Sequence, residues 1–184
     1  MNKLTIKSLV AAAALTAGAL PALAQHGHAA SPHITINAVI DHDSITLSYG
    51  APYTKDPRSG EARKVWGGLV PYGEVWRTGA DEATTLTTKE ALVVGDTTIP
   101  AGTYTLWTLP APDGSAKLII NKQTGQWGTQ YDASQDLARL DLKKETVSCP
   151  VNHFTMAVER SASGGAIKLM WEDTAYALPF TVKK

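Results

Sequence analysis

Residues 34–49 read Ile-Thr-Ile-Asn-Ala-Val-Ile-Asp-His-Asp-Ser-Ile-Thr-Leu-Ser-Tyr, and this stretch decides the fold class. Its apolar side chains recur at alternate positions, namely Ile34, Ile36 and Ile40, and then Ile45, Leu47 and Tyr49. A period of two is the pattern of a strand with one buried face. The polar run 41–44 is rich in residues that favour turns. The stretch therefore predicts two antiparallel strands joined as a hairpin.

The same alternation continues through most of the chain. Further strands are expected over 84–88, 92–94, 97–99, 103–109 and 117–121, and over three later runs, 154–158, 167–171 and 176–182. For region 133–147 we expect a helical turn at most, followed by a strand. About eight to ten short strands separated by turns predict an all-β fold with little helix, either an antiparallel β-sandwich or a distorted barrel.

The first 24 residues have the pattern of a secretory signal peptide. Two lysines precede an apolar stretch, and small residues up to Ala24 allow cleavage before Gln25. A membrane anchor fits less well, because the apolar stretch has only about a dozen residues and a spanning helix needs roughly 20. We expect an exported protein, periplasmic or secreted, with a signal peptide at 1–24, a flexible leader at 25–32 and a single β-sandwich domain at 33–184.

The charge balance excludes several kinds of partner. The chain has 17 Lys and Arg and 17 Asp and Glu, and Lys3 and Lys7 would leave with the signal peptide. A chain so close to neutral has no electrostatic attraction to nucleic acid or to an anionic membrane, and no later segment is apolar enough to span one. Cys149 is the only cysteine, so an internal disulfide is excluded, and an inert thiol is favoured over a nucleophile.

Segment 63–85 carries the strongest functional signal. It is irregular and rich in glycine, and it gathers six aromatic and charged side chains, Trp66, Tyr72, Trp76, Arg77, Asp81 and Glu82. Aromatic faces beside polar groups suit glycans and other partly apolar ligands, and the planar fork of Arg77 suits a carboxylate or phosphate. In the structural alternative, Arg77 pairs with Asp81 or Glu82 and the tryptophans plug one end of the sandwich.

Two further functions remain open. An extracytoplasmic hydrolase acting on glycans would use Asp81 or Glu82 with Glu74 or a histidine, although neighbours in an extended chain point to opposite faces. Copper would bind His26 and His28 in the leader. The chain lacks His-Glu-x-x-His, Gly-x-Ser-x-Gly and Walker-type motifs. We therefore favour a non-enzymatic binding or envelope-associated domain that takes a small molecule or glycan without a cofactor, and its oligomeric state stays open.

The run from Trp66 to Thr84, W-G-G-L-V-P-Y-G-E-V-W-R-T-G-A-D-E-A-T, resembles the signature of a family of exported bacterial proteins, domain of unknown function 2911. The resemblance continues through 99–104, 121–122 and 127–128, and it covers about residues 35–180. It implies an extracytoplasmic β domain and supplies no substrate. Asp81 departs from the family pattern, which has Asn at that position.

Overall fold

The computed structural model describes residues 31–183. The predicted signal peptide, 1–24, and the two leader histidines, His26 and His28, lie outside the described residues. Where the description begins, Ser31 is buried. The carbonyl oxygen of Pro32 accepts a hydrogen bond of 2.8 Å from the amide of Ala51. The chain therefore contacts the domain from its first described residue.

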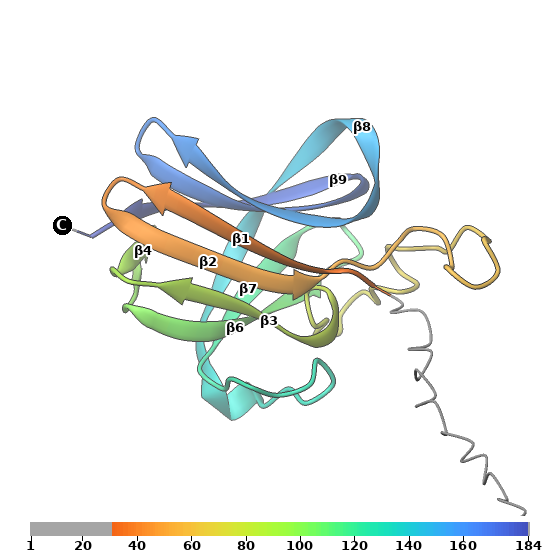
Figure 1. Ribbon diagram of the computed structural model, residues 1–184, viewed down its shortest axis with the longest axis horizontal. Helices are drawn as coiled ribbons and strands as arrows, with labels where there is room; N and C mark the ends of the chain where they lie inside the picture. Colours follow the sequence, from red (N-terminus) through yellow and green to blue (C-terminus); the bar gives the residue numbers. More distant parts are fainter. Residues whose placement is uncertain (1–30, 184) are drawn as a thin grey trace, which may run out of the picture.

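Nine strands form one antiparallel sheet in the described part of the chain (Figure 1). They are β1 (His33–Ile40), β2 (Asp43–Gly50), β3 (Ala80–Thr88), β4 (Leu92–Val94), β5 (Thr97–Ile99), β6 (Gly102–Pro110), β7 (Ala116–Asn121), β8 (Asp136–Ser161) and β9 (Gly164–Val182). One short 3-10 helix, η1 (Ala133–Gln135), precedes β8. The strand order is β1-β2-β3-β6-β7-β8-β9-β4-β5, which confirms the predicted antiparallel all-β class. Within residues 31–183, no helix has the length and apolar character needed to cross a membrane.

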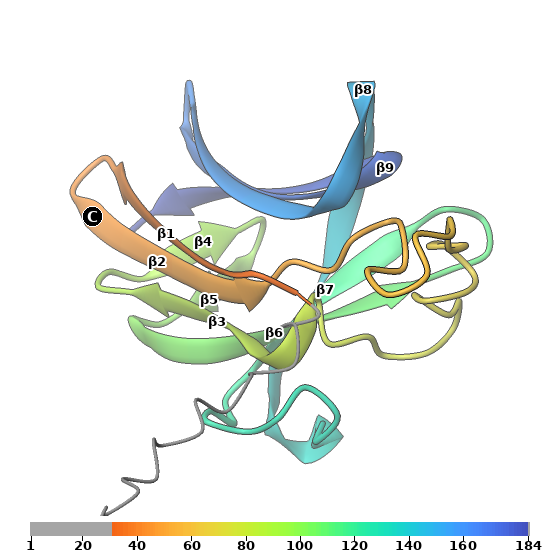
Figure 2. The ribbon, with the colours of Figure 1, turned by 45° about the vertical axis from the view of Figure 1, so that its right-hand side comes forward.

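Strand β8 connects the two layers of the fold. Its first residues, up to Leu142, pair with β7, and the residues from Lys143 onward pair with β9. Figures 1 and 2 show β8 rising beside β7 and then arching with β9 over the layer formed by β1, β2, β3, β6 and β7. One continuous sheet therefore folds back on itself as a sandwich. With 26 and 19 residues, β8 and β9 are much longer than the short strands expected from the sequence.

The core lies between these two layers. An inward row crosses four strands in register through Ile36, Leu47, Leu86 and Tyr104. From the other layer, Phe154 of β8 and Trp171 of β9 belong to the same buried cluster. The alternation that predicted the first hairpin is confirmed, because its inward positions on β2 are almost fully buried. Removal of this apolar surface from water is the main source of stability for such a sandwich.

The connection between β2 and β3, residues 51–79, is anchored to both layers. Tyr53 forms an isolated bridge with His153 of β8. Trp76 exchanges two backbone hydrogen bonds of 2.8 Å with Thr108 of β6. Between these anchors the connection projects as a lobe from one end of the sandwich (Figure 1). The second half of segment 63–85 is therefore part of the sheet framework, which fixes where its side chains point.

A second connection, residues 122–135, covers the outward face of β6 and β7. Trp107 lies beneath it, with its ring centroid 4.9 Å from that of Tyr131. The Tyr131 hydroxyl donates a hydrogen bond of 2.6 Å to a carboxylate oxygen of Asp136, and Asn121 donates one of 2.9 Å to the other oxygen. These contacts fix the connection to the sheet.

Tyr131 is expected to make the protein sensitive to alkali. Burial, together with the hydrogen bond and charge of Asp136, raises the pKa of Tyr131 to about 12 from an ordinary value of 10.0. The folded protein holds this proton more tightly than the unfolded chain, so the associated stability is complete below about pH 10 and is lost as the pH rises towards 12. The midpoint of urea unfolding should therefore fall less steeply over this range in Tyr131→Phe than in the wild type. Parallel curves for the two proteins would contradict the assignment.

Candidate functional site

The six residues singled out by the sequence do not converge on one point. Trp66 packs its ring edge-on against Tyr176 of β9, with 5.6 Å between centroids. Tyr72 is partly exposed and covers Gly67, where a Cβ atom would lie 2.7 Å from the tyrosine ring. Trp76 is only 8% exposed and belongs to the core. The three aromatic side chains are therefore largely structural, and they do not form a shared platform.

Three of the six residues do meet, at a small cleft. Trp76, Arg77 and Asp81 line it together with Arg63 and Trp171, and its volume is about 200 Å³. The indole rings of Trp76 and Trp171 stack with an interplanar angle of 27° and centroids 5.9 Å apart. The cleft therefore combines an aromatic wall with two guanidinium groups and one carboxylate.

The two arginines of the cleft have no ion-pair partner among residues 31–183. Neither Arg63 nor Arg77 has a carboxylate oxygen within 4.0 Å. The Arg63 guanidinium donates to the carbonyl oxygen of Tyr53, and its buried Nε has no hydrogen-bond partner in the described chain. The predicted structural alternative, in which Arg77 pairs with Asp81 or Glu82, is not the arrangement found.

The backbone beneath the cleft is strained. Thr78 and Asp81 have φ values of 54° and 64°, a region that costs energy for residues with a Cβ atom. The hydroxyl groups of Thr78 and Thr108 lie 2.7 Å apart in a buried hydrogen bond. The carbonyl oxygen of Thr78 accepts a second buried bond, of 2.7 Å, from Thr84. These two bonds hold the turn that presents Arg77 and Asp81 to the cleft.

Gly128 supports the same turn from the neighbouring connection. Its amide donates a hydrogen bond of 2.9 Å to the carbonyl oxygen of Asp81. A Cβ atom at this position would lie 2.6 Å from Cδ of Arg77 and 2.7 Å from the Asp81 oxygen. Only glycine therefore allows the Arg77 stem to lie so close to the backbone.

Asp81 and Glu82 both contact His33, the first residue of β1. His33 Nε2 lies 3.2 Å from an Asp81 carboxylate oxygen, and Nδ1 lies 3.5 Å from a Glu82 carboxylate oxygen. We expected these neighbours to point to opposite faces, and that expectation is wrong because the positive φ of Asp81 breaks the alternation. Since the carboxylates approach different ring nitrogens, one metal ion does not fit between all three groups. No metal-binding group of three or more such residues occurs within residues 31–183.

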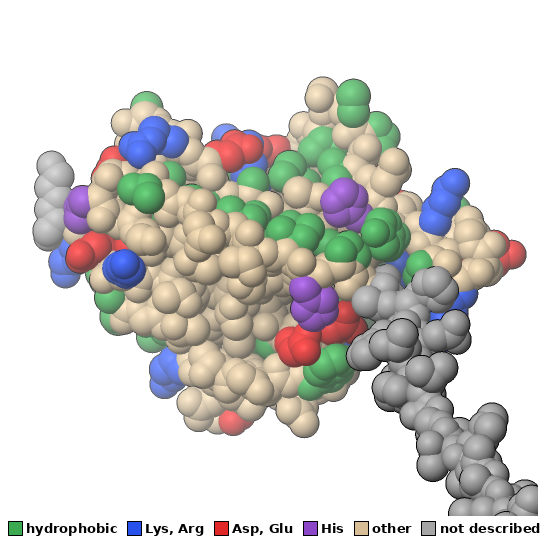
Figure 3. Space-filling model, viewed as in Figure 1, with side chains coloured by type: hydrophobic (Ala, Val, Ile, Leu, Met, Phe, Trp, Pro, Cys, Tyr) green, Lys and Arg blue, Asp and Glu red, His purple; other side chains and the backbone are tan. Residues whose placement is uncertain are grey.

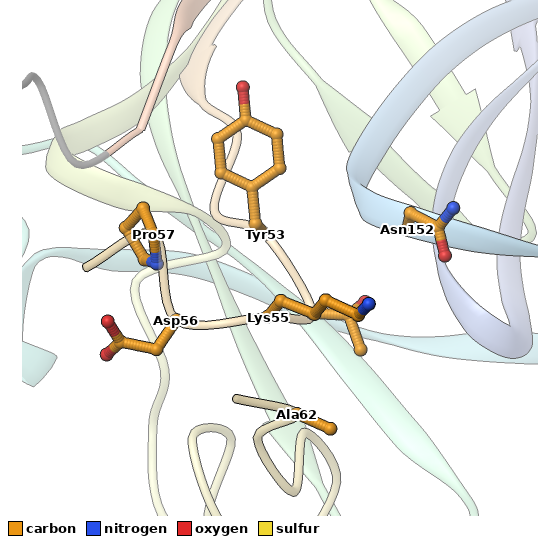
Figure 4. A pocket seen from close by; sticks show the side chains of 7 residues that line it. Tyr53, Lys55, Asp56, Pro57, Ala62 and Asn152 are labelled. Carbon is orange, nitrogen blue, oxygen red and sulfur yellow. The ribbon is translucent and has the colours of Figure 1, made fainter. Parts of the chain in front are cut away.

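A larger depression, with a volume of about 460 Å³, is lined by residues of the 51–63 segment and by Asn152. Figure 4 shows Lys55 pointing towards the side where Asn152 lies, Asp56 and Pro57 on the opposite side, and the ring of Tyr53 above Lys55. It contains none of the six predicted residues. Asp56 already accepts hydrogen bonds from the amides of Arg58 and Ser59, and these hold the pKa of Asp56 below its usual value. The carboxylate of Asp56 is therefore less available to a ligand than the arginines of the smaller cleft.

Sequence reasoning missed three residues that build the cleft. Arg63 falls inside segment 63–85 but carried no signal beyond its charge. Trp171 was assigned only to an alternating strand, and Gly128 only to the family resemblance. Trp171 lines the cleft and Gly128 supports the turn beneath it, and both come from parts of the chain that lie well beyond segment 63–85. The one available hint for Trp171 was that a tryptophan follows Ile167 and Leu169 in an otherwise aliphatic strand pattern.

The fold and the cleft define an antiparallel β-sandwich domain with an arginine- and tryptophan-lined site at one end. The profile of a family described as protein of unknown function, DUF2911, matches residues 31–180. Because the match covers most of the sequence, the chain belongs to this family, as its resemblance predicted. Comparison with curated proteins finds no match, and comparison with solved structures finds none either.

Proposed function

We propose that the protein is an exported, non-enzymatic binding domain whose cleft takes a small anionic ligand. The observation that carries the proposal is that Arg63 and Arg77 both line the cleft without an ion-pair partner among residues 31–183. Two guanidinium groups in a partly buried site attract a carboxylate or phosphate and offer it paired hydrogen bonds. The proposal that the protein is exported rests on the signal-peptide pattern of residues 1–24. Sequencing the amino terminus of the mature protein would test it, and Gln25 is the first residue expected.

The size and walls of the cleft narrow the ligand. A volume of about 200 Å³ is smaller than the roughly 300–1,000 Å³ typical of sites for drug-sized molecules. The site therefore suits a small anion or the anionic end of a longer molecule. Asp81 also lines the cleft, and its carboxylate accepts a hydrogen bond from a ligand hydroxyl. A small hydroxylated carboxylate meets both requirements.

The hydrolase alternative has less support. Asp81 and Glu82 contact one imidazole, but their side chains are 33% and 60% exposed. Solvent screens charges at such positions and competes with a substrate for the carboxylate oxygens. Copper binding by His26 and His28 remains a prediction for the part of the chain outside residues 31–183.

Replacement of Arg77 by glutamine is expected to weaken anion binding at least tenfold. A hydrogen bond to a charged group contributes about 1.5–3 kcal/mol, and glutamine keeps a long polar side chain without the charge. Trp76 and Trp171 line the cleft, so their fluorescence reports occupancy. Titrations would use inorganic phosphate and lactate as probes.

Arg58→Gln is the matched control, because Arg58 is an exposed arginine outside the cleft. It should bind both probes as the wild type does. Both variants should unfold within about 1 kcal/mol of the wild type, since neither arginine belongs to the core. Failure of the wild type to bind either probe, or equal binding by Arg77→Gln, would refute the proposal.

A further inference from the structure

The outward face of β1, β2, β3 and β6 carries two ordered rows of hydroxyl and amide side chains. The first row runs in register through Thr35, Ser48 and Thr85. The second runs through Asn37, Thr46, Thr87 and Thr103. Sheet geometry spaces such positions by about 4.8 Å between strands and by about 6.7 Å along a strand. A regular two-dimensional array of hydrogen-bonding groups results.

The array is rigid, because its members hold one another. The Thr35 and Ser48 hydroxyls lie 2.9 Å apart, and those of Thr87 and Thr103 lie 3.0 Å apart. The Thr46 hydroxyl donates a bond of 2.8 Å to the Asn37 amide oxygen. Each hydroxyl has one donor and two acceptor positions, so every one keeps capacity for an outside partner. Threonine side chains are also stiff at χ1, which lowers the entropy cost of binding.

No charged residue interrupts these seven positions. Figure 3 shows the same lack of charge as a broad tan area, with histidine and acidic side chains gathered where it ends near the start of β1. Nucleic acids and anionic membranes are bound by cations, which the array lacks. Protein interfaces are enriched in aromatic residues, methionine and arginine at their centre, and the array has none of these. The class of partner that best matches this array is a neutral molecule rich in hydroxyl groups.

One end of the array adds the groups that sugars require. His33 and Glu82 border a depression of about 220 Å³ that also includes Thr35, Ser48 and Thr85. Trp127 forms an isolated backbone bridge with Glu82 and is 46% exposed. Side chains opposite each other in an antiparallel bridge lie on the same face. An exposed indole for stacking therefore stands beside a carboxylate that accepts hydrogen bonds from sugar hydroxyls.

We propose that this face binds a neutral polysaccharide chain, laid along the hydroxyl rows with one sugar ring at Trp127 and Glu82. The site is distinct from the anion cleft, which is lined by other side chains. Its hydrogen bonds are exchanged between uncharged hydroxyls, so binding should survive high salt. The inference does not depend on the function proposed for the cleft, and either one stands if the other fails.

Depletion of the full chain from solution by insoluble cellulose, chitin and β-1,3-glucan tests this proposal, at about 0.15 M and about 1 M NaCl. We expect binding to at least one of the three at both salt concentrations. A triple variant, Thr46→Val, Thr85→Val and Thr87→Val, removes three hydroxyls at nearly constant shape and should bind at least tenfold more weakly. The matched triple serine variant keeps the hydroxyls and should bind within about threefold of the wild type.

Two further variants make the result decisive. Trp127→Ala, at an exposed position, should also weaken polysaccharide binding several-fold, and it is independent of how the triple variants fold. Arg58→Gln, at an exposed arginine that lines neither site, should leave polysaccharide binding unchanged. Binding to none of the three polysaccharides, loss of binding at high salt, or equal binding by the valine variant would overturn the proposal.

Discussion

Trp76→Ala is expected to lower the free energy of unfolding by about 3–5 kcal/mol, the range for truncating a buried aromatic side chain. The indole of Trp76 is 8% exposed. It stacks on Trp171 and meets the Phe154 ring edge-on, with centroids 5.1 Å apart at 88°. Alanine would leave a cavity between the two layers, because Phe154 and Trp171 are themselves fixed by packing. Urea unfolding followed by circular dichroism measures the loss.

Trp127→Ala is the matched control, since Trp127 is 46% exposed and contributes little to the core. We expect it to cost under about 1 kcal/mol. Trp76→Phe should recover part of the lost stability by refilling the cavity, at a smaller cost than alanine. If Trp76→Ala were as stable as Trp127→Ala, the indole would be a ligand platform resting on the core, and its structural role would be disproved.

Local alternation predicted the strands of the fold well and their lengths poorly. The runs at 167–171 and 176–182 were interpreted as separate strands, yet both belong to β9. Glu172, between them, has a φ of 54°, and the register between β8 and β9 shifts there. A bulge and a turn have similar local composition, and only the partner strand distinguishes them. That partner is distant in sequence, so the pattern alone did not reveal the continuous strand.

The candidate cleft also depends on residues that are distant in sequence. The composition of segment 63–85 singled out Arg77 as a candidate, since an arginine among glycines and aromatics is informative by itself, and Arg77 lines the cleft. Its environment depended on contacts that no local pattern encodes. In the sequence, Asp81 and Glu82 are near enough to pair with Arg77. In the structure, both carboxylates contact His33 instead. The positive φ of Asp81 decides that outcome, and such an angle is uncommon even for aspartate, which adopts it more readily than most residues.

Gly50→Ala is expected to destabilise the protein by about 3 kcal/mol and to abolish anion binding as well. A Cβ atom on Gly50 would overlap the carbonyl oxygen of Ala80 and lie 2.9 Å from its carbonyl carbon. These are backbone atoms, so no side chain can rotate away to relieve the clash, and overpacking of this kind costs about 1–3 kcal/mol or more. Gly50 pairs directly with Ala80 at the irregularity between β2 and β3.

The expected loss of binding follows from the position of Ala80. It lies between Arg77 and Asp81 in sequence, in the turn held by Thr78, so displacing Ala80 moves the groups that line the cleft. Gly60→Ala is the control: it has a φ of 76° but no atom within 4 Å of the added Cβ, so it should cost only about 1–2 kcal/mol of backbone strain. Thermal unfolding and phosphate titration of both variants separate the two effects. Normal binding by a folded Gly50→Ala protein would show that the cleft does not depend on the close approach of β2 to this turn.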